Sequence, residues 1–209
     1  MSIIEVKNVT LKIKDKVLLN NVNINIEKGS AVGLTGDNGS GKTVLMKCIC
    51  GFFMHQQGEI NVNGKRIGKD TDFPENMGLI IETPGFIPYF SGYKNLEYLA
   101  SIKGKISKIE IINALEKVGL EQEMNKKAGK YSLGMRQRLG IAQAIMEDPD
   151  ILILDEPMNG LDSFGVEVVR ELLLELKQKG KTILLTSHNK EDIDLLCDKV
   201  YRMEKGILL

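Results

Sequence analysis

Residues 36–43 read GDNGSGKT, a glycine-rich turn between the apolar run SAVGLT and the helix-like run TVLMKCICGF. The turn fits G-x-x-x-x-G-K-[ST], a pattern that requires a strand before it and a helix after it. Glycines let several backbone N–H groups face one point, and a helix N-terminus adds partial positive charge. We therefore predict that these residues wrap the phosphates of a nucleoside triphosphate: Gly36, Asp37, Asn38, Gly39, Ser40, Gly41, Lys42 and Thr43.

Two side chains of this loop have predicted roles. Lys42 can reach the β- and γ-phosphates, and the Thr43 hydroxyl can ligate Mg²⁺. The alternative is a glycine turn that binds nothing, and the flanking strand and helix argue against it.

Three carboxylates, Asp155, Glu156 and Asp162, lie within LDEPMNGLD, directly behind the apolar run ILIL. Taken alone, this pattern favours a solvated turn after a strand. A triphosphate site, however, needs an acid at the end of a neighbouring strand to complete its metal shell. We therefore predict that Asp155 is a Mg²⁺ partner, directly or through water. Glu156 is then placed to orient a water molecule and accept its proton.

Composition restricts the partners of the chain. Its 209 residues suit one large α/β domain or one domain with a subdomain. Twenty-eight basic residues balance 28 acidic ones, which leaves no footprint for nucleic acid and no polybasic membrane patch. No apolar run approaches the ~20 residues of a membrane helix, and the start lacks a secretory signal, so we expect a cytosolic protein.

The pattern of apolar residues predicts an α/β fold. VKNVTLKI, VNINI (22–26) and EINVN (59–63) alternate as strands with one buried face, and short connections favour antiparallel pairing. From residue 150, ILILD, a long helix that stops at Gly180, and KTILLTS imply parallel strands with crossover helices.

The middle of the chain is helical. Ser107 and Glu110 form a possible capping box, and other helices are expected after Ser91 and around 135–147. We expect a single domain over 1–209, with a core of 1–85 and 148–209 and a helical subdomain at about 86–147. Cys48 and Cys50 point to different faces of a predicted helix, which favours buried thiols over a shared metal site.

The ordered motifs resemble the nucleotide-binding subunit of an ATP-binding cassette (ABC) transporter, from roughly residue 3 to 205. They are the phosphate loop GDNGSGKT, the signature-like YSLGMRQR (131–138), the Walker B strand ILILDEP (151–157), the D-loop NGLD (159–162) and the switch sequence TSH (186–188). The resemblance implies an ATPase with a P-loop core, a mostly parallel sheet, an N-terminal antiparallel β subdomain and an inserted helical subdomain.

The resemblance also implies two cassettes that face head to tail, with each ATP held between the phosphate loop of one and the signature of the other. Ser132 and Gly134 would touch the γ-phosphate in trans, and Asp162 would cross the interface. His188 would hold the γ-phosphate and Glu156 in register. An integral membrane permease would be the partner, which would place the chain on the inner face of the membrane.

Some residues depart from the family pattern. Glu82, in LIIETPGF, stands where a glutamine usually serves the metal, and it would add negative charge there. Leu133 and Met135 replace a glycine and a glutamine of the signature, and Ile13 stands where an aromatic usually stacks on adenine. Glu82 together with SLGMRQR resembles cassettes for lantibiotic immunity or bacitracin resistance.

Other possibilities remain at this point. A cassette that acts on ribosomes or DNA is one alternative, although the chain has neither basic extensions nor a second cassette. A P-loop kinase or GTPase is another, but a kinase would not need the signature-like segment 131–138 and the D-loop 159–162. The apolar segment 83–93 is either a docking surface for the permease or ordinary packing.

Overall fold

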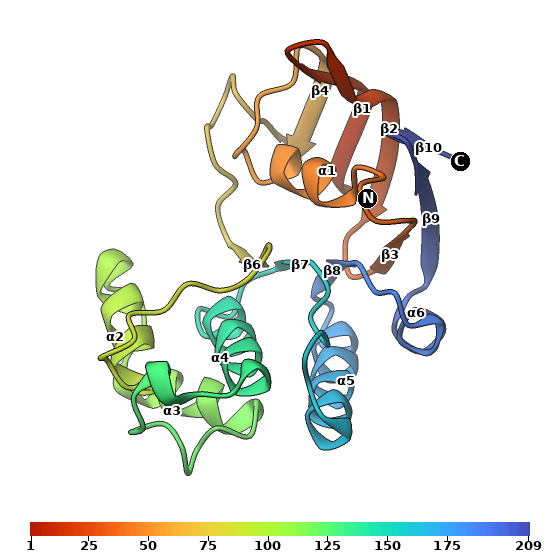
Figure 1. Cartoon of the computed structure of the whole chain (residues 1–209). Helices are drawn as coiled ribbons and strands as arrows, with labels where there is room; N and C mark the ends of the chain where they lie inside the picture. Colours follow the sequence, from red (N-terminus) through yellow and green to blue (C-terminus); the bar gives the residue numbers. More distant parts are fainter.

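Alternating apolar residues near the start of the chain form an antiparallel sheet of four strands in the order β2-β1-β4-β5 (Figure 1). The computed structural model describes residues 1–209. The pairing of β1 with β2 and with β4 confirms the predicted antiparallel arrangement. The strands are β1 (Ser2–Ile13), β2 (Lys16–Glu27), β4 (Gln57–Val62) and β5 (Lys65–Arg66).

A second sheet has the order β10-β9-β3-β8-β7-β6 and is parallel except for the pair β9–β10. This confirms the mostly parallel sheet. Strand β8 lies between β3 and β7, so the glycine-rich loop and the acidic turn leave the same edge on either side of it. The strands are β3 (Ala31–Thr35), β6 (Met77–Ile80), β7 (Ile151–Leu154), β8 (Thr182–Leu185), β9 (Lys199–Glu204) and β10 (Ile207–Leu208).

Six α-helices and one 3₁₀ turn complete the fold, and α2, α3 and α4 lie together in Figure 1. The capping box of Ser107 and Glu110 is confirmed at the start of α3. Helix α4 begins two residues earlier than predicted, because Ser132 caps it by accepting from the Met135 N–H. The helices are α1 (Lys42–Ile49), α2 (Gly92–Lys103), α3 (Lys108–Lys117), α4 (Leu133–Ile145), α5 (Ser163–Gln178) and α6 (Lys190–Leu196), with the 3₁₀ turn at Ala128–Lys130.

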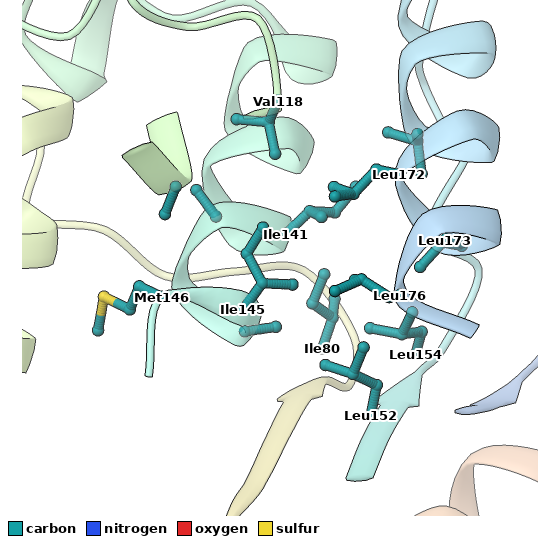
Figure 2. Packing of buried hydrophobic residues seen from close by; sticks show 14 of the residues in the cluster. Ile80, Val118, Ile141, Ile145, Met146, Leu152, Leu154, Leu172, Leu173 and Leu176 are labelled. Carbon is teal, nitrogen blue, oxygen red and sulfur yellow. The ribbon is translucent and has the colours of Figure 1, made fainter. Parts of the chain in front are cut away.

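The core packs helices against the parallel sheet. Figure 2 shows Ile141 and Ile145 of α4 and Leu176 of α5 converging over Ile80 and Leu154 from the strand ends. The structure contains no helix with both the length and the apolar character needed to cross a membrane.

The predicted buried thiols are confirmed. Cys48 and Cys50 are free and buried in a second cluster that α1 forms with the antiparallel sheet. Burial raises the pKa of each of these thiols to about 12, so both stay protonated at neutral pH.

The contact of β6 with α4 is very close. A Cβ atom built on Gly78 would lie 1.9 Å from the carbonyl oxygen of Ala144. We predict that Gly78→Ala lowers the free energy of unfolding by about 1–3 kcal/mol through overpacking. Gly85→Ala is the matched control, because no heavy atom lies within 4 Å of the corresponding Cβ position. Denaturant titration measures both, and equal stabilities would contradict the prediction.

Candidate nucleotide site

The glycine-rich loop curls around the ammonium group of Lys42. Lys42 is 8% exposed and donates from Nζ to the carbonyl oxygens of Gly36 (2.6 Å) and Asp37 (3.0 Å). Gly36 has φ +139°, and a Cβ there would lie 2.1 Å from the carbonyl oxygen of Met203. The loop can therefore pass beside β9 only with glycine at this position.

The carboxylate of Asp155 accepts hydrogen bonds on both of its oxygens. Thr43 donates from Oγ1 to Oδ2 (2.6 Å), and Thr186 donates from Oγ1 to Oδ1 (2.7 Å). Thr186 is fully buried at the end of β8, the strand between the two predicted halves of the site. The structure thus brings Thr43 and Asp155 together as predicted, and it adds Thr186, to which the sequence analysis gave no role.

Glu156 directs its carboxylate toward the switch segment. The backbone N–H of His188 donates to Oε2 (3.2 Å), and the Nε2 atom of His188 lies 3.4 Å from Oε1. Oε1 is buried and has no hydrogen-bond partner. The carboxylate therefore keeps an acceptor for one more donor, as a base that activates water requires.

Lys42, Thr43, Asp155, Glu156 and His188 line a cavity of about 550 Å³, within the usual size range of small-molecule sites. Lys16, Val17 and Leu18 of β2 line the cavity, as do Lys205 and Gly206 after β9. Ile13, expected to contact the base, does not line it. The bend of the chain between β1 and β2 brings the start of β2 to the cavity instead, so Val17 and Leu18 are the apolar residues that face it from this strand.

Glu82 does not join the predicted metal ligands. Its carboxylate pairs with Lys47 of α1 (Nζ to Oε1, 2.5 Å), and its side chain is 65% exposed. It does not line the cavity that holds Thr43 and Asp155. The lysine therefore offsets the negative charge that the sequence analysis expected beside the metal.

The residues predicted to act in trans lie outside this cavity of their own chain. Ser132 caps α4, and Asp162 caps α5 by accepting from the Gly165 N–H (2.8 Å). Gly134 packs beside Gly160. Their roles toward a facing chain stay predictions.

The donor set fits Mg²⁺. This ion takes oxygen ligands and is commonly bound by one or two carboxylates together with substrate phosphates. The Thr43 hydroxyl and the Asp155 carboxylate offer oxygen atoms as metal ligands, and they are in direct contact beside the phosphate loop.

The chain is similar to proteins of one family along its whole length. The family model described as ABC transporter matches residues 19–159. The uncharacterized ABC transporter ATP-binding protein YybJ of Bacillus subtilis is 46% identical over 98% of this chain and 94% of its own length. The bacitracin transport ATP-binding protein BcrA of Enterococcus faecalis is 40% identical over 99% of this chain and 68% of its own length. The lantibiotic transport ATP-binding protein SrtF of Streptococcus pyogenes is 35% identical over 99% of this chain and 89% of its own length.

Solved structures agree with this assignment. The dimeric structure of MJ0796, a bacterial ABC transporter cassette, has a TM-score of 0.89 at 26% identity and covers 98% of this chain and 96% of that one. A dimeric post-hydrolysis state of the same cassette, bound to ADP and Pi, has a TM-score of 0.88. The phosphate loop, the acidic strand end and these relatives together identify the chain as an ATPase that belongs to the family of ABC transporter ATP-binding proteins.

Proposed function

We propose that this chain hydrolyses Mg²⁺-bound ATP in the cavity described above and thereby powers the export of a peptide antibiotic through a separate membrane permease. The observation that carries the proposal is the convergence of the phosphate loop, the Thr43–Asp155 pair and the Glu156–His188 pair on one cavity.

Each of these groups has a proposed task. The N–H groups of the loop and the start of α1 bind the phosphates, and Lys42 moves from the loop carbonyls to the terminal phosphates. Thr43 and Asp155 would hold Mg²⁺, which would offset phosphate charge. Glu156 accepts the proton of the attacking water through its free acceptor atom. His188 keeps that carboxylate oriented.

We predict that Glu156→Gln lowers kcat for ATP hydrolysis by about 10²–10⁴, the usual contribution of a general base. The KM for ATP should stay near that of the wild type, because the amide keeps the size of the carboxylate. Glu167→Gln, an exposed residue of α5, is the control. Phosphate release assays measure kcat and KM for each variant. An undiminished kcat in Glu156→Gln would exclude this carboxylate as the base.

The second proposed feature is a head-to-tail dimer in which Ser132, Gly134 and Asp162 serve the facing chain. The N-cap residues of α4 and α5 do not line the nucleotide cavity of their own chain. The N-terminus of α4 can therefore present its N–H groups to a phosphate bound by a second cassette. The dimeric state of the similar cassette supports this arrangement.

Mixing two inactive variants tests the dimer. We predict that Lys42→Ala and Ser132→Arg each lose ATPase activity as a pure protein. An equal mixture should regain about a quarter of wild-type activity, since half of the dimers contain one intact site of two. The measurement is ATP turnover after subunit exchange, with wild type mixed with itself as the standard. Zero recovery would show that Ser132 does not act across a homodimer.

An exposed aromatic cluster is the proposed permease contact. Tyr89 packs edge-on against Phe90 with ring centroids 5.2 Å apart, and Phe90 lies 6.4 Å from Tyr98. Tyr89 is 68% exposed and Tyr98 is 55% exposed. Phe86, from the same segment, packs against the core, so 83–93 combines ordinary packing with an open surface. The proposed helical subdomain of about 86–147 would carry this surface on the cytoplasmic side of the membrane.

The cargo proposal rests on the bacitracin and lantibiotic transport proteins among the relatives. We predict that cells producing this chain become more susceptible to bacitracin or to a lantibiotic when the chain is removed, while susceptibility to chloramphenicol stays constant. The double variant Tyr89→Glu and Tyr98→Glu should fail to restore resistance although its isolated ATPase activity is normal.

The control for this experiment is Phe73→Glu, which changes an equally exposed aromatic residue elsewhere on the chain. Growth inhibition assays provide the measurement. If removal of the chain alters susceptibility to neither peptide class, the proposed cargo is wrong.

A further inference from the structure

Gln137 of α4 reaches the acidic turn with its side-chain amide. The residue is 7% exposed, and its Nε2 atom donates to the carbonyl oxygens of Glu156 and Pro157, each at 3.2 Å. A buried amide with two backbone acceptors has a fixed position, because either lost bond leaves a buried polar group unpaired.

The turn that Gln137 holds is conformationally unusual. Glu156 has φ +49°, in the left-handed region that residues with a side chain rarely occupy. Its N–H donates to Thr186 (2.8 Å), and its carbonyl also accepts from the Asn159 N–H (3.1 Å). Such a conformation persists only when neighbouring groups hold it from several sides. Gln137 is the group that holds it from α4.

The start of α4 contacts the same turn independently. A Cβ on Gly160 would lie 2.5 Å from Cδ2 of Leu133, and a Cβ on Gly134 would lie 2.9 Å from the Gly160 carbonyl oxygen. The first turn of α4 and residues 156–160 are therefore packed too closely to move separately.

We propose that Gln137 is a positioning residue that sets the direction of the Glu156 carboxylate and joins it rigidly to the first turn of α4. This rests on the proposed function, in which Glu156 acts in the cavity of its own chain and Ser132 and Gly134 act on the facing one. A phosphate contact at the start of α4 is then transmitted through Gln137 to the carboxylate that works on the other ATP. Gln137 thereby links the two nucleotide sites within one chain.

The test replaces Gln137 with methionine, which keeps the length of the side chain and removes the donor. The carboxylate should lose its alignment, so we expect kcat for ATP to fall about 10–100-fold with KM unchanged. Gln143→Met is the matched control, because Gln143 lies on the same helix and makes no hydrogen bond with the turn. Binding of a fluorescent ATP analogue should match that of the control, whereas the thermal unfolding midpoint should be somewhat lower, because the Pro157 carbonyl loses its donor.

A kcat equal to that of the Gln143→Met control would overturn the inference, and so would a fall in kcat accompanied by weaker ATP binding. If Gln137→Met does not fold, Gln137→Asn replaces it, because its amide is one methylene too short to reach both carbonyls, and the same outcomes apply. Glu156→Gln is measured alongside. A silent Glu156→Gln counts against the proposed function, whereas a silent Gln137 variant with a dead Glu156→Gln counts against this inference alone.

Discussion

The site depends on the two hydrogen bonds that the carboxylate of Asp155 accepts. The carboxylate accepts from Thr43 at the start of α1 and from Thr186 at the end of β8, so one side chain connects the ends of β7 and β8 with the start of α1. Without these two bonds, the buried end of β7 would carry an unpaired charge, which is costly in a protein interior. The same pair of threonines fixes the distance between the phosphate loop and Glu156.

Local motifs were sufficient to predict that the phosphate loop and the acidic turn lie side by side. The loop of 36–43 and the acids at 155 and 156 carry their geometry in a few consecutive residues, and the strand-loop-helix context is visible in the sequence. The alternation in 22–26 and 59–63 likewise predicts the antiparallel strands, because one buried face requires it. These features do not depend on which strand lies next to which.

The features that were missed depend on tertiary arrangement. The insertion of β8 between β3 and β7 is not encoded in any local pattern, and it is what gives Thr186 its role. Strand β6, only Met77–Ile80, is too short for its period to distinguish a strand from a helix. Glu82 was expected to serve the metal from its place in the chain, and only the fold shows that its carboxylate pairs with Lys47 of α1. Gln137 belongs to the signature-like segment 131–138, yet only the fold shows which carbonyls it reaches.

The turn between β9 and β10 joins parts of the chain that are far apart in sequence. The N–H of Gly206 donates to the Ser40 carbonyl (2.7 Å), and its own carbonyl accepts from the Asn20 N–H (2.8 Å). Gly206 thus links the phosphate loop to β2 of the antiparallel sheet through backbone hydrogen bonds. During synthesis on the ribosome, Gly206 emerges after every other residue that lines the cavity, so the phosphate loop gains this backbone bond last.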